Sequence, residues 1–200
     1  MQLKKGRVQM KVLIQGRDSS LPLINTEREM MILYSASEIA KWFLAYNTSN
    51  RRTVCSDDDE FELYEGISHL KLQKLLFYAQ GIYLAWNDGV PLFHENIHAW
   101  QHGPVVPEVY NEYKKYGKNF IPYEQNSEIE AIINKIEDDK KAYEALCATY
   151  DNFAIYTAWQ LRNMTHENGT PWLETITKQG ENAVINNELI KDYFLENIVE

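Results

Sequence analysis

Apolar residues recur at helical spacing along most of the chain from residue 35 onward. The segment 68–87 has the clearest pattern, with Ser68 placed to begin a helix and Gly89 placed to end it. One face carries Leu72, Leu75, Leu76, Ala79, Ile82, Tyr83 and Trp86. Other faces are apolar as well, and a helix that is apolar nearly all round is usually buried by its neighbours. We therefore expect 68–87 to be a buried central helix.

Shorter helices are expected on both sides of this segment. Ser35 and Glu38 have capping-box spacing and begin the first of them. The further helices are expected over 107–116, 127–148, 151–164, from 170 and from 186. The stretch 91–106 has no helical period and contains Gly103-Pro104, so it is expected to be a loop or hairpin. The pattern predicts a mostly α single helical domain around a buried central helix, with at most a small β-hairpin near 90–106 or 119–123.

The first 34 residues differ from the rest in composition. Five basic residues precede position 18: Lys4, Lys5, Arg7, Lys11 and Arg17. We expect 1–34 to be an extension, either disordered or the result of a start assigned too far upstream of Met30-Met31, and 35–200 to be the domain. A second polar stretch, 47–65, contains Asp57, Asp58 and Asp59 and is expected to be a solvated loop.

Charge and cysteine content narrow the functional classes. The formal net charge is −9, which gives no broad cationic field for a phosphate backbone, so nucleic acid is not an expected partner. Cys55 and Cys147 have no metal spacing and form no disulfide framework. No apolar run is long enough to span a bilayer, and no signal peptide is recognisable, so we expect a cytoplasmic protein with no membrane partner.

Three segments carry a recognisable motif. The first is Lys71-Leu72-Gln73-Lys74-Leu75-Leu76-Phe77-Tyr78-Ala79-Gln80. The second combines Pro91-Leu92-Phe93 with Ala99-Trp100-Gln101-His102-Gly103-Pro104-Val105-Val106-Pro107. The third is Thr165-His166-Glu167-Asn168-Gly169-Thr170-Pro171-Trp172. Their order and spacing resemble the Panacea (SocA-like) antitoxin family, which is found in phage-associated proteins, over about 35–194.

The resemblance implies an antitoxin that binds a cognate toxin, expected to be encoded beside it. It also implies, for a SocA-like protein, a role as a proteolytic adaptor that delivers the toxin to a AAA+ protease. The family carries no established catalytic residues, so the resemblance implies no enzyme activity and no cofactor. The first 30 residues and the acidic 47–66 loop depart from the family pattern, which leaves the identity of the toxin open.

Histidines are the candidates for chemistry. His94, His98 and His102 recur every four residues, a spacing that could hold zinc on a helix, but their segment lacks helical periodicity, so no metal is expected. His166 could act as a general base, yet no nucleophile motif accompanies it. We expect its imidazole to cap helix carbonyls instead.

Polar residues on the buried helix need partners. Gln73, Lys74, Tyr78 and Gln80 are expected to bond with the other motif segments, because an unpaired buried polar group costs roughly 1–3 kcal/mol. The expected members of this motif network in those segments are Trp100, His102, Gly103, Pro104, His166, Pro171 and Trp172. The alternative is a polar pocket for a ligand or a toxin segment.

Three functional classes follow from these observations. The favoured one is an antitoxin-like protein-binding module. The others are a mobile-element hydrolase using His102 or His166, and a DNA-binding regulator using the basic N-terminal residues. The predicted partner-binding residues are Asp57, Asp58, Asp59, Tyr110, Tyr113 and Tyr116, because acidic side chains suit a basic partner and tyrosines anchor interfaces.

Overall fold

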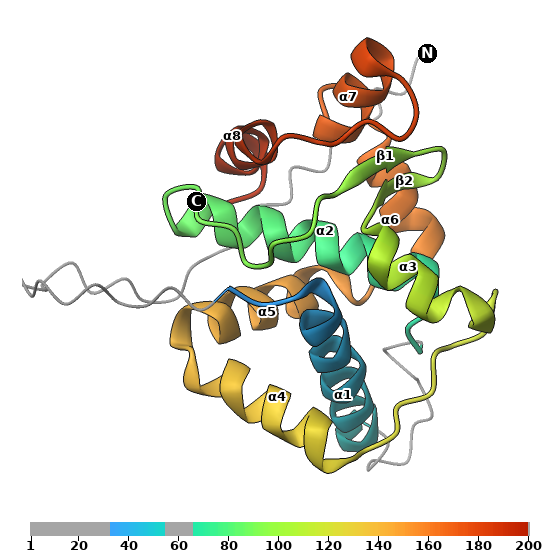
Figure 1. Ribbon diagram of the computed structural model, residues 1–200, viewed down its shortest axis with the longest axis vertical. Helices are drawn as coiled ribbons and strands as arrows, with labels where there is room; N and C mark the ends of the chain where they lie inside the picture. The colour runs from blue at the N-terminus through green and yellow to red at the C-terminus, as the bar shows by residue number, and fades with distance from the viewer. Residues whose placement is uncertain (1–32, 55–65, 200) are drawn as a thin grey trace, which may run out of the picture.

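The computed structural model describes residues 33–54 and 66–199 (Figure 1). Within these residues the chain forms eight α-helices, one 3₁₀ helix and one two-stranded sheet. In chain order these are α1 (Ala36–Val54), α2 (His69–Trp86), β1 (His98–Trp100), β2 (Gly103–Val105), α3 (Pro107–Tyr113), the 3₁₀ helix η1 (Lys114–Tyr116), α4 (Ser127–Asp138), α5 (Lys140–Phe153), α6 (Ala158–Thr165), α7 (Pro171–Gln179) and α8 (Asn187–Asn197). The mostly α fold predicted from the sequence is confirmed.

Helix α2 lies at the centre of the fold, packed against α5, α6, α8 and β2 (Figure 1). Every residue from Lys71 to Leu84 is buried, as the apolar pattern predicts. Gly81 lets α8 come close, because a Cβ built there would lie 2.3 Å from the Phe194 ring. The Ser68 side chain caps the first turn by accepting from the Lys71 N–H.

Helix α1 begins with the expected capping box. The Glu38 carboxylate accepts from the Ser35 N–H at 2.7 Å, and the Ser35 hydroxyl accepts from the Glu38 N–H at 3.2 Å. Burial alone would raise the pKa of Glu38, but the Ser35 bond and Lys135 outweigh it and lower that pKa. The Glu95 carboxylate also bonds to the start of α1, where it accepts from the Ala36 N–H at 2.8 Å.

The prediction of a single helix over 127–148 is wrong, because α4 and the first part of α5 occupy this range. Asp139 has extended backbone between α4 and α5, and its carboxylate accepts from the first N–H groups of α5. The Tyr34 hydroxyl donates to the same carboxylate at 3.1 Å. A charged residue that can cap a helix therefore interrupts the pattern, which apolar spacing alone does not reveal.

Helix α4 begins at Ser127, where the expected range begins, and Asn126 caps it. The expected helix start at Asp151 is corrected. Helix α5 runs through the expected start at Asp151 and ends at Phe153, and α6 begins instead after Thr157, which forms a capping box with Gln160.

The segment 98–105 forms the small hairpin expected between α2 and α3. His98 pairs with Val105 and Trp100 with Gly103 in an antiparallel register. The chain after α7 lies along the outer edge of β1, where the Ala99 N–H donates to the Ala183 carbonyl at 2.8 Å.

The two expected segments of unusual composition fall largely outside the structure. Residues 1–32, with the basic extension, and 55–65, with the acidic run, are not among the described residues. Tyr34, which the sequence placed in the extension, is fully buried in the core. Of the helices that are described, none combines the length and apolar character needed to cross a bilayer.

Candidate functional site

The motif segments meet along one side of α2, where Lys74 is the innermost polar residue. Its side chain is 0% exposed, and its Nζ donates to the Pro104 carbonyl at 2.9 Å. Burial, together with the neighbouring Arg162 charge, lowers the pKa of Lys74 to about 7. The bond from Lys74 to Pro104 ties the second motif segment to the central helix.

Two glutamine side chains hold the 91–106 segment at its two ends. The Gln80 amide accepts from the Leu92 and Phe93 N–H groups at 3.0 and 3.2 Å and donates to the Phe93 carbonyl at 3.3 Å. The Gln73 amide oxygen accepts from the Val106 N–H at 2.8 Å. Because that segment has little secondary structure of its own, these side chains provide backbone partners that a longer sheet would otherwise supply.

Gly103 is required by the close approach of Lys74. Its φ is +104°, and a Cβ there would lie 2.7 Å from Lys74 Nζ and 2.9 Å from Thr165 Oγ1. Both the backbone conformation and the space exclude a side chain at this position. Gly103 thus brings the second and third motif segments onto Lys74 together.

His166 and Trp172 close the third side of the motif network. The Trp172 indole N–H donates to the Trp100 carbonyl at 2.8 Å, and the His166 ring lies 3.6 Å from the Trp172 ring. His166 Nδ1 lies 2.7 Å from the Arg162 carbonyl and Nε2 lies 3.3 Å from the Gln101 carbonyl. Burial lowers the pKa of His166. A neutral imidazole has a single N–H, so it donates to one of these carbonyls, and we assign the shorter.

A hollow lies away from the motif network, between α1 and α4. This α1–α4 groove has a volume of about 590 Å³ and lies between residues 42–50 and residues 130–137, with Tyr123 and Gln125 beside it. In Figure 1 α4 runs from the end of α1 back toward α5. A smaller hollow of about 220 Å³, which also includes Tyr123, lies between α1 and the segment from α3 to α4.

Comparison with known proteins decides the family. The family model described as "Antitoxin SocA-like, Panacea domain" matches residues 72–173. Antitoxin SocA of Caulobacter vibrioides (strain NA1000 / CB15N) is 31% identical over 139 residues, which cover 64% of this chain and 72% of that protein. The chain belongs to the SocA-like Panacea family. No solved structure matches it.

The matched Panacea region, from α2 to the start of α7, contains all the residues of the predicted motif network. Helices α1 and α8 lie outside it, although α8 packs closely on α2. One side of the α1–α4 groove, formed by α4, lies within the matched region, and the other side, formed by α1, lies outside it.

Most of the predicted network residues bond to backbone and not to other side chains. The side chains of Gln73, Lys74, Gln80 and Trp172 each bond to a backbone group of another motif segment. Tyr78 contributes its ring, which stacks on Phe153 with centroids 3.9 Å apart. Pro171 and Thr170 begin α7.

His102 differs from the other predicted network members. Its side chain is exposed in the turn between β1 and β2, and the strand pairing on either side of the turn is made by backbone atoms of Trp100 and Gly103. His94 and His98 bond separately to the Tyr34 and Asn182 carbonyls. Within the ranges that the structure describes, no group of three potential ligand side chains is placed to hold a metal ion.

Two buried residues of the motif segments were missed as candidates. Thr165 Oγ1 donates to the Arg162 carbonyl and lies beneath Gly103. Lys71 is 2% exposed and donates to the Ala154 carbonyl at 2.7 Å. A lysine in an otherwise apolar helix was the available signal for Lys71, whereas nothing in the sequence distinguishes Thr165 from a surface threonine.

The predicted partner-binding tyrosines do not form one surface. Tyr113 and Tyr116 line the smaller hollow beside α1. Tyr110 faces the hairpin instead, with its ring 4.9 Å from Trp100 and 5.5 Å from His69. Asp57, Asp58 and Asp59 lie outside the described residues.

Proposed function

We propose that this protein is an antitoxin that neutralises a cognate toxin by binding it directly. Membership of the SocA-like Panacea family carries the proposal, since an antitoxin implies a toxin as partner. We further propose that the toxin is encoded by an adjacent gene and that the two proteins meet in the cytoplasm.

The hydrogen bonds of the motif residues support a binding role for the protein and not a catalytic one. Lys74, the Gln73 amide oxygen and the Gln80 amide are buried and bonded to backbone, so they stabilise the fold and do not face a substrate. His166 has carbonyl groups against both ring nitrogens, and His102 is exposed alone at a turn. The Thr165 hydroxyl lies 3.3 Å from His166 Nδ1, but it is buried and donates to the Arg162 carbonyl at 2.8 Å. Among the described residues, therefore, neither histidine lies beside an accessible nucleophile of the kind that a hydrolase needs.

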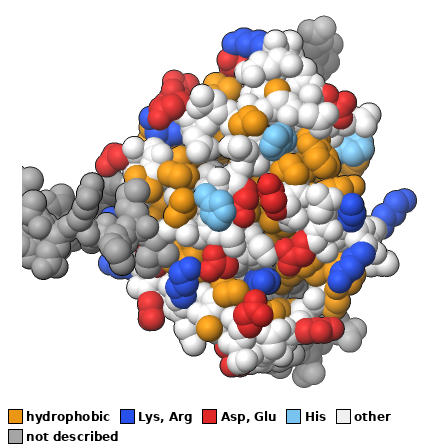
Figure 2. Space-filling view, in the orientation of Figure 1, with side chains coloured by type: hydrophobic (Ala, Val, Ile, Leu, Met, Phe, Trp, Pro, Cys, Tyr) orange, Lys and Arg blue, Asp and Glu red, His pale blue; other side chains and the backbone are white. Residues whose placement is uncertain are grey.

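The surface charge also favours a protein partner. Figure 2 shows acidic and basic side chains interspersed on the visible face, without a continuous basic patch. With a formal net charge of −9, the chain suits a partner that carries positive charge. Residues outside the motif network can then vary to fit the toxin while the network keeps the fold.

Co-expression tests the proposal. The adjacent gene should be toxic when expressed alone and harmless with this protein, and the two proteins should co-purify. A neighbour that is harmless alone, or that stays toxic without forming a complex, would contradict the antitoxin function. Repeating the experiment in cells that lack individual AAA+ proteases tests the adaptor role, because protection by direct inhibition does not need a protease.

A further inference from the structure

The α1–α4 groove combines aromatic rings with carboxylates. On one side, Trp42, Ala45, Tyr46 and Ser49 follow each other at i, i+3, i+4 and i+7, which places them on one face of α1. Trp42 and Tyr46 stack with ring centroids 4.5 Å apart. Tyr123 adds a third ring from the segment before α4. Trp42 is 0% exposed, so the rings that a neighbouring chain or ligand can contact are those of Tyr46 and Tyr123.

The α4 side of the groove carries two carboxylates. Glu130 and Glu137 are two helical turns apart, about 10 Å along the axis, and both are exposed. Ile133 and Asn134 lie between them on the same side. No lysine or arginine is among the described residues that line the groove.

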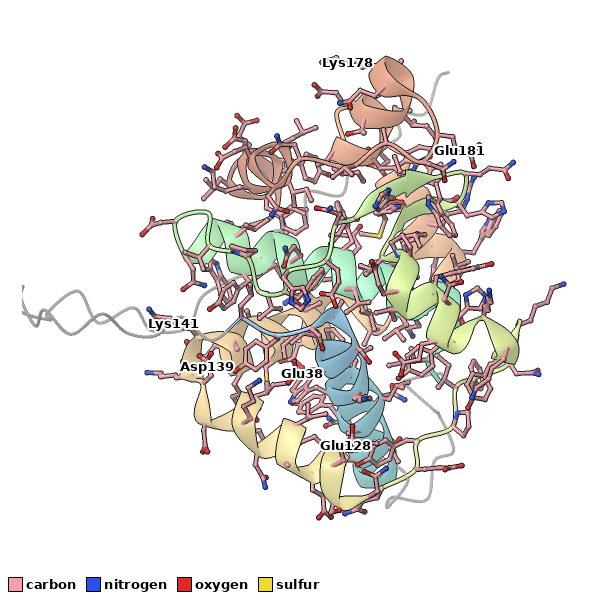
Figure 3. All side chains as sticks on the ribbon, viewed as in Figure 1. Glu38, Glu128, Asp139, Lys141, Lys178 and Glu181 are labelled. Carbon is pink, nitrogen blue, oxygen red and sulfur yellow. The ribbon has the colours of Figure 1, made fainter. Side chains whose placement is uncertain are left out.

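Two basic side chains of the helices that form the groove are paired elsewhere. Lys135 of α4 bonds to Glu38 at 2.9 Å, and Lys41 of α1 lies 3.7 Å from Glu128. Figure 3 shows Glu38 and Glu128 on α1 and α4, around the helices that form the groove. Glu130 accepts a neutral hydrogen bond from Gln125. Among the side chains that the structure describes, which exclude those of residues 51–54, neither Glu130 nor Glu137 has a cationic partner. These two carboxylates therefore give the groove negative charge beside the Tyr46 and Tyr123 rings.

We infer that the α1–α4 groove binds an arginine- or lysine-bearing segment of the toxin, an inference that rests on the proposed function. A cationic side chain can lie against the face of Tyr46 or Tyr123 while bonding to a carboxylate, and the two contacts reinforce each other. A volume of about 590 Å³ is within the usual range of binding clefts, about 300–1,000 Å³. The occupant is thus larger than one side chain, as expected for a peptide segment.

The first experiment uses the toxin that co-purifies with the wild-type protein. Glu130→Gln together with Glu137→Gln keeps side-chain shape and removes both charges, and should weaken toxin binding roughly tenfold at low salt, with a smaller loss at high salt. Asn134→Arg, which places a competing cation between the two carboxylates, should weaken it at least as much. Glu181→Gln together with Glu196→Gln is the matched control, since both residues are exposed and Glu181 lies at the opposite end of the molecule (Figure 3).

Carbodiimide cross-linking of the complex identifies the occupant directly. This reagent joins a carboxylate to a lysine amine, so peptides linking Glu130 or Glu137 to a toxin lysine are expected. Links from these residues to Lys4, Lys5 or Lys11 would show that the chain's own basic residues fill the groove, which would overturn the inference. Neutralisation that survives all groove variants would overturn it too, while leaving the antitoxin function intact.

A second experiment does not depend on the toxin. The probe is a short peptide that alternates alanine with arginine, compared with the same peptide carrying citrulline, which has a similar shape and no charge. NMR should show shifts at the Trp42 indole and the Asn134 side-chain amide with the arginine peptide alone, lost in the Glu130→Gln, Glu137→Gln variant. Shifts scattered over the whole surface, or equal shifts with both peptides, would mean that the groove is not a specific cation site.

Discussion

Lys74, Gln73 and Gln80 of the motif network are buried and bonded to backbone, whereas the carboxylates on the α4 side of the α1–α4 groove are exposed beside aromatic rings. In the network, Lys74 and Gln80 hold a segment with little secondary structure against α2. In the groove, Glu130 and Glu137 have no cationic partner within the described part of the chain. The contrast suggests that the motif residues maintain the fold and that recognition depends on residues outside the motif.

The largest expected difference between the two regions is in stability, and two tryptophans test it. Trp172 is 6% exposed and bonded to Trp100, while Trp159 is 59% exposed. Trp172→Ala should lower the free energy of unfolding by about 3–5 kcal/mol and abolish protection, because it leaves a cavity in the network. Trp159→Ala is the control, with little change expected by chemical denaturation. Equal effects of the two substitutions would contradict the structural role of the network.

Gly103→Ala should cost less than Trp172→Ala but still be clearly destabilising. The added Cβ is strained at a φ of +104° and collides with Lys74 Nζ and Thr165 Oγ1. Gly169→Ala provides the control, because its φ is +85° and nothing lies within 4 Å of its Cβ position. A loss of about 1–3 kcal/mol beyond that of the control is expected in thermal or chemical denaturation. If both variants lose the same amount, the close approach of Lys74 contributes nothing.

Lys74 should make the stability of the protein depend on pH above neutrality. Unfolded lysine, with a pKa of 10.5, stays protonated, whereas the folded pKa of about 7 means that the folded protein binds fewer protons above that pH. The free energy of unfolding should therefore rise by about 1 kcal/mol per pH unit between pH 7 and 8.5. The window stops there because burial raises the pKa of Cys147, which acts in the opposite direction at higher pH.

Urea denaturation at several pH values measures this slope. Lys74→Met should flatten it, whatever the substitution does to absolute stability, whereas Lys118→Met at an exposed position should leave it unchanged. Burial lowers the pKa of His69 and His166, so the unfolded imidazoles, with a pKa of 6.5, still add a positive slope near pH 7 that fades as the pH rises. The two proteins are therefore compared in the upper part of the window, where both imidazoles are neutral in the folded and unfolded states. A wild-type protein with no slope between pH 7 and 8.5 would mean that Lys74 stays charged in the fold.

The smallest expected effect on stability comes from the groove. Glu130→Gln and Glu137→Gln should change the free energy of unfolding by less than about 0.5 kcal/mol, because both side chains are exposed. Thermal denaturation of the single and double variants checks this. A large loss of stability would show that the carboxylates support the fold, and the distinction between the two regions would then fail.

Helical spacing and capping chemistry in the sequence were enough to predict the central helix, the small hairpin and the start of α1. These depend on local rules, because a helix that is apolar all round must be buried and Ser35 with Glu38 can only bond within one turn. The break at Asp139 was missed, because apolar spacing continues across it and does not show that the Asp139 carboxylate caps α5. The bond from Tyr34 to the same carboxylate joins residues 105 positions apart, which the sequence does not show.

The sequence by itself determined the family, the helical class and the polar motif residues that would need partners. Tertiary structure alone decided what those partners are. Side-chain pairs were expected, but Lys74, Gln73 and Trp172 bond to carbonyl and N–H groups of the segments around the hairpin. Nearly every residue carries the same backbone N–H and carbonyl groups, so the sequence does not show which of them will bond to a buried side chain. The α1–α4 groove was equally hidden, because it forms only when helices separated by more than 70 residues pack side by side.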